Sequence, residues 1–263
     1  MIDRFDSALW KVDRARKHAD DLEMEVRAFW DANPFEVEMV GTPLTGPGSF
    51  RVKRMATVPE SIALIAGDAA HNIRSALDHF AWSAVPPHQR RRQTCFPVWS
   101  STAAPGPAKW REQVSRQLQG ATTDLIEAVV ELEAWDAGRD SLLWVIHELD
   151  RIDKHRLLLS VAIAFTGIGL DGDSYELAVA KKYSGVDAAR PLVITPRERT
   201  PLEEGKILFA SSEGAGLSAA KATLTFDLTL GGPARVTEES AVTWLRILAG
   251  LAEKVIRDLA PLA

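Results

Sequence analysis

Two stretches of the sequence concentrate side chains that can transfer protons or hold a phosphate. The first, from His71 to His79, reads His-Asn-Ile-Arg-Ser-Ala-Leu-Asp-His, and the second, from His147 to Arg156, reads His-Glu-Leu-Asp-Arg-Ile-Asp-Lys-His-Arg. Histidine changes its charge near neutral pH, and guanidinium or ammonium groups bind phosphate. Each stretch therefore holds the residue types that general acid–base catalysis needs.

The first stretch falls in a predicted helix that Pro59 and Glu60 open and that runs to about Val85. On a helical wheel its apolar side chains form one buried stripe: Ile62, Ile65, Ala69, Ile73, Ala76 and Phe80. Three polar side chains point away from that stripe, namely His71, Arg74 and Asp78, and three flank it, namely Asp68, Asn72 and His79. The alternative interpretation is an ordinary solvated face.

The second stretch falls in a helix predicted from Asp140, a good N-cap, to about Phe165. On its wheel Asp153 and Arg156 fall inside the apolar stripe. A buried charge costs several kcal/mol unless it is paired and hydrogen-bonded, so both side chains are expected to be buried with partners. An internal ion pair without any chemistry is the alternative.

If these two helices pack together, a polar layer forms between them, with histidines close to carboxylates and cations. The candidate catalytic residues are Arg74, Asp78, His79 and His155. The candidate substrate-binding residues are His71, Asn72, Arg90, Arg91, Lys154 and Arg156, and the structural polar layer contains Asp150 and Asp153. A divalent metal on His71, His147 and Asp150 is a competing hypothesis, but the neighbouring cations oppose a second positive charge, and no metal or cofactor is expected.

Periodicity elsewhere predicts an α+β protein with about five to six helices flanking a mostly antiparallel β segment. Further helices are expected at 3–32, 110–119, 122–134 and 237–259, and strands at 35–40, 50–58, 175–183, 192–195, 207–210 and 222–230. A long loop is expected from Pro86 to Pro107. We expect a single domain over 1–263, with a helical core of 1–165 and 237–263 and an inserted β-rich segment at about 167–233.

Composition narrows the class of protein further. The chain is 46% apolar and 25% charged, which is typical of globular domains, and its net charge of -5 disfavours a general nucleic-acid binder. Residues 50 to 110 nevertheless carry eight Lys or Arg against three acids, a local balance of +5 that favours a phosphate backbone. The first residues lack an export signal and the longest apolar run is about half a membrane helix, so a cytoplasmic, non-membrane protein is expected.

Arg74 and His79, with four residues between them, resemble the R-x4-6-H motif of the HEPN superfamily. The wider strings are also similar to those of bacterial proteins of unassigned role. The resemblance implies a metal-independent ribonuclease of a toxin or defence system, acting as a homodimer, with RNA cut by attack of its own 2′-hydroxyl and a cognate antitoxin or regulatory protein as a partner. It makes His79 the general acid/base and Arg74 the group that binds the scissile phosphate.

Two other functions stay open at this point. One is a non-catalytic binding or regulatory module in which the polar layer is structural. The other is a small-molecule enzyme whose site lies between the helices 59–85 and 140–165.

Overall fold

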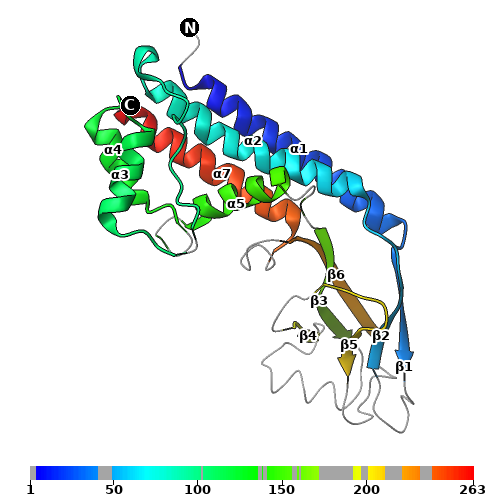
Figure 1. Cartoon of the computed structure of the whole chain (residues 1–263). Helices are drawn as coiled ribbons and strands as arrows, with labels where there is room; N and C mark the ends of the chain where they lie inside the picture. The colour runs from blue at the N-terminus through cyan, green and yellow to red at the C-terminus, as the bar shows by residue number, and fades with distance from the viewer. Residues whose placement is uncertain are drawn as a thin grey trace. The chain divides into compact units, whose positions relative to one another are not determined.

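The structure is a computed structural model that describes residues 4–40, 49–101, 103–135, 138, 141–155, 159, 161–171, 192–196, 201–210, 221–231 and 239–263. These residues form six α-helices and six β-strands (Figure 1), which confirms the α+β class and the antiparallel sheets. The chain divides into two compact units, one of residues 1–25, 60–160 and 231–263 and the other of residues 26–59 and 161–230. The single domain stays a prediction.

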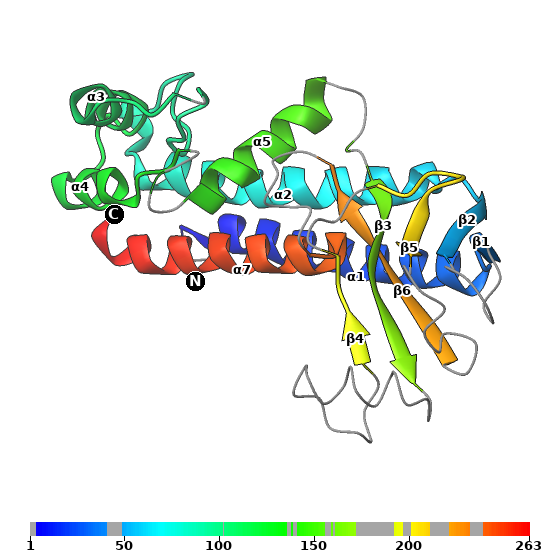
Figure 2. The same ribbon diagram turned by 90° about the horizontal axis from the view of Figure 1, so that it is seen from below.

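The first unit is helical. It contains most of α1 (Asp6–Asp31), then α2 (Glu60–Ala84), α3 (Pro107–Gln117), α4 (Thr123–Leu132), α5 (Ser141–His155) and α7 (Ala241–Leu259), with short 3-10 turns at Pro87–Gln89 and Ala260–Leu262. Helices α1, α2 and α7 lie side by side, and α5 crosses α2 and also contacts α7 (Figures 1 and 2). None of the described helices is long and apolar enough to cross a membrane.

Small residues let α5 approach α2 closely. Helix α2 buries Ala66, Gly67, Ala69 and Ala70. A Cβ added at Gly67 would lie 2.1 Å from Asp153 Oδ1, so the α5 carboxylate rests directly against the α2 backbone. Only glycine leaves room for that carboxylate where it now lies. This close approach brings the polar residues of the two helices together.

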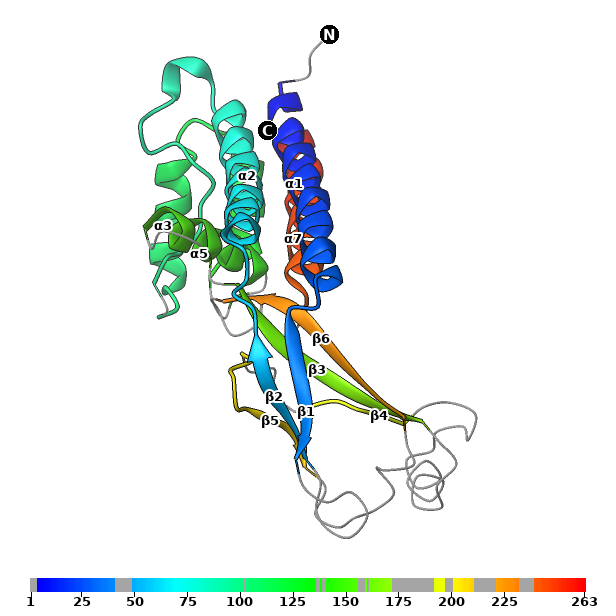
Figure 3. The same cartoon turned by 90° about the vertical axis from the view of Figure 1, so that its right-hand side faces the viewer.

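The second unit is built from two three-stranded antiparallel sheets. One has the order β1 (Phe35–Val40), β2 (Ser49–Met55), β5 (Ile207–Ala210), and the other has β4 (Leu192–Ile194), β3 (Val161–Asp171), β6 (Lys221–Leu230). Figure 3 shows β3 and β6 as a long pair and β1 and β2 as a hairpin. The rings of Phe35 and Phe226 lie 4.1 Å apart between centroids, so an aromatic contact joins β1 of one sheet to β6 of the other.

Two predicted helix boundaries are wrong. The helix expected over 140–165 ends at His155, and Val161 begins strand β3, because pairing with β6 outweighs the short apolar pattern of this segment. The last helix begins at Ala241 rather than at residue 237, because the Ser240 hydroxyl caps it by accepting a hydrogen bond from the Thr243 backbone N–H at 3.0 Å.

The other predicted elements are confirmed within a few residues, apart from the strand expected at 175–183, which lies outside the described residues. The helical core predicted over 1–165 included the hairpin of β1 and β2, which lies in the second unit. Strands β1 and β2 belong to the same unit as β3 to β6, and β2 pairs with β5.

Candidate functional site

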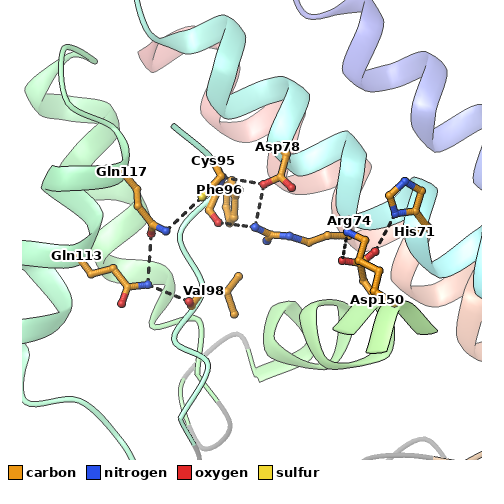
Figure 4. Close-up of polar contacts among 10 residues, drawn as sticks. His71, Arg74, Asp78, Cys95, Phe96, Val98, Gln113, Gln117 and Asp150 are labelled. Carbon is orange, nitrogen blue, oxygen red and sulfur yellow. Dashed lines mark hydrogen bonds and ion pairs between the residues drawn. The ribbon is translucent and has the colours of Figure 1, made fainter. Parts of the chain in front are cut away.

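A histidine on α2 and a carboxylate on α5 form the best-defined polar pair in the helical unit. His71 Nδ1 lies 2.8 Å from Asp150 Oδ1 (Figure 4). Asp150 Oδ2 accepts a hydrogen bond from Lys154 Nζ at 2.7 Å. Asp150 is only 5% exposed, whereas the side chains of His71 and Lys154 are 45% and 47% exposed. A buried carboxylate thus holds an imidazole and an ammonium group at the surface.

The second ring nitrogen of His71 is available for proton transfer. Its Nε2 lies 3.4 Å from the hydroxyl oxygen of Ser75, one helical turn further on. Because Asp150 engages Nδ1, it orients the ring and favours the tautomer in which Nε2 carries the lone pair. An imidazole oriented by a carboxylate in this way is a common general acid/base.

Arg74 points into the protein. Its side chain is 8% exposed, and Nη2 donates hydrogen bonds to Asp78 Oδ1 and to the Phe96 carbonyl oxygen, each at 2.8 Å. Asp78 Oδ1 also accepts from the Phe96 backbone N–H at 3.0 Å (Figure 4). Among the residues that the structure describes, Arg74 Nη1 is buried without a hydrogen-bond partner. The guanidinium therefore fastens α2 to the segment that contains Phe96.

Two glutamines of α3 hold the same segment from its other side. Gln117 Nε2 lies 3.2 Å from Cys95 Sγ, and Gln113 Nε2 donates to the Val98 carbonyl oxygen at 2.9 Å. Burial, and next the negative charge of Asp78, raise the pKa of the Cys95 thiol. A protonated thiol that is packed in this way is a structural residue rather than a nucleophile.

The side chains of His79 and Arg74 do not point toward a common substrate group. His79 follows Arg74 by five positions, which is about 140° on an ideal helix, and His79 is exposed whereas Arg74 is buried. Burial, followed by the charge of Lys11, lowers the pKa of His79, so its imidazole is neutral at pH 7. The phosphate-binding role of Arg74 stays a prediction that would require the guanidinium to leave its present bonds.

The remaining candidate residues have varied surroundings. Asn72 is buried and links α1 to α2, since its Nδ2 donates to the Asp68 carbonyl oxygen at 2.8 Å and its Oδ1 accepts from Lys11 Nζ at 3.3 Å. Arg90 Nε donates to the Val85 carbonyl oxygen at 3.0 Å, and Arg91 is exposed. The side chain of His155 and all of Arg156 lie outside the described residues.

His147 is close enough to Arg74 for its charge to matter. Burial, and next the guanidinium of Arg74, lower the pKa of His147, so this imidazole stays neutral. Among the described residues, no group of three or more His, Cys, Asp or Glu side chains is placed to hold a metal ion. The hypothesis of a metal on His71, His147 and Asp150 therefore gains no support from this part of the chain.

Two residues on the same face of α2 as His71 were missed by sequence reasoning. Ser75 follows His71 by four positions, and Trp82 follows Ser75 by seven, so all three share one face of the helix. That spacing is visible in the sequence. However, Trp82 gave no signal of exposure, because a tryptophan near a helix end is usually packed.

Asp153 was predicted to be buried with a hydrogen-bonded partner, and the structure differs from this. It is half-buried beside Gly67, and no hydrogen bond to its carboxylate occurs within the described part of the chain. Burial, and then the negative charges of Asp150 and Asp68, raise its pKa. The folded protein therefore binds this proton more tightly than the unfolded chain, and stability falls as the pH rises through the folded-state pKa.

Asp153→Asn should therefore stabilise the protein at pH 7.5, by roughly 1–2 °C in Tm. The gain should shrink towards the unfolded pKa of about 3.9, where the carboxyl is protonated in both states. Thermal unfolding followed between pH 4.5 and 7.5 measures it, with Glu112→Gln, an exposed position on α3, as the control. A variant less stable than the wild type at pH 7.5 would mean that the ionised carboxylate has a stabilising partner.

Comparisons of the chain with protein-family models, with curated proteins and with solved structures found no match. Its function is therefore inferred from its own side chains.

Proposed function

We propose that this protein is a cytoplasmic, metal-independent ribonuclease in which His71 is the general acid/base. The observation that carries the proposal is the 2.8 Å contact between the half-exposed imidazole of His71 and the buried carboxylate of Asp150. The choice of RNA as the substrate rests on the resemblance of the α2 motif to the HEPN superfamily. The proposal moves the proton-transfer role from His79 to His71, because His71 has an orienting carboxylate.

The reaction would proceed by internal transesterification. His71 Nε2 takes the proton from a ribose 2′-hydroxyl as its oxygen attacks the adjacent phosphorus, and the bond from phosphorus to the 5′-oxygen breaks. The products are a 2′,3′-cyclic phosphate and a 5′-hydroxyl end. The leaving 5′-oxygen takes its proton from solvent water, and the His71 imidazolium then returns its own proton to solvent. Asp150 stabilises the imidazolium that forms. Lys154, which shares Asp150 with His71, supplies positive charge for the phosphate oxygens.

Cleavage of single-stranded RNA in the presence of EDTA tests the proposal. We expect an all-ribose oligonucleotide to be cut and to yield 2′,3′-cyclic phosphate ends. The same sequence made of DNA should stay intact, because it lacks the nucleophile, and one 2′-deoxy position should protect only its own linkage. Cleavage of the DNA, loss of activity in EDTA or an uncut RNA would each contradict the mechanism.

The small-molecule enzyme is the second candidate, and the same observation favours it, because the His71–Asp150 pair lies between the two helices that were expected to form its site. An enzyme of that kind would hydrolyse small phosphate or carboxylate esters in a His71-dependent way and leave RNA uncut. The homodimer and the antitoxin or regulatory partner also stay predictions. Light scattering of the pure protein, and of the protein co-purified from its host, measures both.

A further inference from the structure

A cavity of about 420 Å³ opens in the helical unit, beside the first turn of α1 and the last turns of α2. It is lined by Ser7, Asp78, His79, Trp82, Ser83 and Thr94. Its volume lies in the range of small-molecule sites. None of these residues takes part in the His71–Asp150 pair, so the cavity is a separate feature of the same helix.

Trp82 gives the cavity a flat aromatic wall. The residue is 45% exposed, which is unusual for an indole, and the guanidinium carbon of Arg90 lies 5.3 Å from its ring centroid. Base–aromatic stacking contributes about 1–3 kcal/mol per base in single-strand binding proteins. A planar ring that stacks on Trp82 would therefore gain affinity at this wall.

Asp78 presents a fixed hydrogen-bond acceptor to the same space. Its Oδ1 is held by Arg74 Nη2 at 2.8 Å and by the Phe96 backbone N–H at 3.0 Å. Within the described residues, its other oxygen, Oδ2, accepts no hydrogen bond, and the side chain is 36% exposed. A carboxylate oxygen held in this way accepts a hydrogen bond from a donor such as an amino group and repels a carbonyl oxygen.

Two exposed arginines lie close in the sequence to Thr94, which lines the cavity. Arg91 and Arg92 are exposed and follow Arg90 directly. The Arg91 backbone N–H donates to the Thr94 hydroxyl at 3.0 Å, which ties this arginine run to a residue of the cavity wall. A ligand that combines a planar ring with an anionic group would match both the aromatic wall and these arginines.

We propose that this cavity binds a nucleotide whose base carries an exocyclic amino group. The base stacks on Trp82, its amino group donates to Asp78 Oδ2, and the phosphate faces Arg91 and Arg92. The inference rests on the proposed function in one respect, since it makes the cavity the base-binding subsite of the RNA strand that reaches His71. Trp82 lies eleven positions beyond His71, a rise of about 16 Å along α2, which a short single strand can span.

Binding of mononucleotides, measured by calorimetry without any cleavage, tests this inference. Cytidine and uridine 5′-monophosphates form a matched pair, because an amino group in one replaces a carbonyl group in the other. We expect the cytidine nucleotide to bind about tenfold more tightly. Trp82→Ala should weaken its binding by about tenfold or more. Trp10→Ala, which removes an exposed tryptophan outside the cavity lining, should leave binding unchanged.

Asp78→Asn supplies the specificity test. The amide keeps an oxygen for Arg74 and Phe96 but offers a donor as well as an acceptor, so the preference for the cytidine nucleotide should disappear. Urea unfolding of the variant confirms that it is folded under the conditions of the titration. Equal binding of the two nucleotides by the wild type, or undiminished binding by Trp82→Ala, would overturn the inference.

The two proposals fail separately. Nucleotide binding with the expected preference, but with no cleavage of RNA, would leave the subsite and refute the ribonuclease. Cleavage of RNA that depends on His71, without nucleotide binding at Trp82, would refute the subsite alone.

Discussion

Replacing His71 by alanine should lower the rate of RNA cleavage by about 10²- to 10⁴-fold, the usual contribution of a positioned general acid or base. The loss should appear in kcat, because proton transfer occurs in the transition state. The side chain is half-exposed, so its removal should cost little stability, and the melting curve should stay close to that of the wild type. Single-turnover cleavage of a labelled oligonucleotide measures the effect.

Two further variants locate the catalytic histidine. Asp150→Asn keeps the shape of the carboxylate, but its amide can donate to His71 Nδ1 and favour the wrong tautomer, so a loss comparable to that of His71→Ala is expected. His79→Ala should have a much smaller effect, because His79 lacks such a partner within the described residues. Full activity of His71→Ala together with inactive His79→Ala would return the role to His79, as the resemblance implied.

Arg74→Ala should destabilise the protein by about 3 kcal/mol, because it removes a buried cation from Asp78 and leaves the Phe96 carbonyl oxygen without its donor. For a chain of this length the loss corresponds to a fall in Tm of roughly 6–12 °C. Urea unfolding followed by circular dichroism measures it. The segment around Phe96 should also become more mobile in the variant, although the Phe96 backbone N–H can still donate to Asp78.

Arg111→Ala is the matched control for this prediction. Arg111 Nη2 donates a hydrogen bond to Glu127 Oε2 at 2.8 Å, yet both side chains are about half exposed, so Arg111→Ala should unfold at nearly the same urea concentration as the wild type. If Arg74→Ala unfolds at the same urea concentration as Arg111→Ala, the buried hydrogen bonds of Arg74 stabilise the protein no more than the exposed Arg111–Glu127 pair does. Any loss of RNA cleavage in Arg74→Ala has to be compared with its stability, since a structural residue and a phosphate-binding residue would both reduce activity.

The helices were predictable where their signals are local. The opening of α2 at Glu60, its apolar stripe and its end before Pro86 are each signalled by residues only a few positions apart, and the observed bounds Glu60–Ala84 follow these signals. The predicted C-terminal end of α5 was wrong because it depends on a contact with a distant segment. The apolar run at residues 157–165 suits a helix or a strand, and β6 (Lys221–Leu230), which pairs with residues 161–171, is far away in the sequence.

The sequence left open whether α2 and α5 pack together. The chain's own residue order was enough to indicate that both helices carry several side chains able to transfer protons or bind phosphate, because helical periodicity and the cost of burying charge operate over short spans. It could not indicate which groups pair. His71 meets Asp150 across 79 positions, and Arg74 turns inward to a carbonyl oxygen 22 positions away, so that His71 stays at the surface while Arg74 does not. Such pairings depend on how whole elements pack, and that packing is fixed by the sum of many distant contacts.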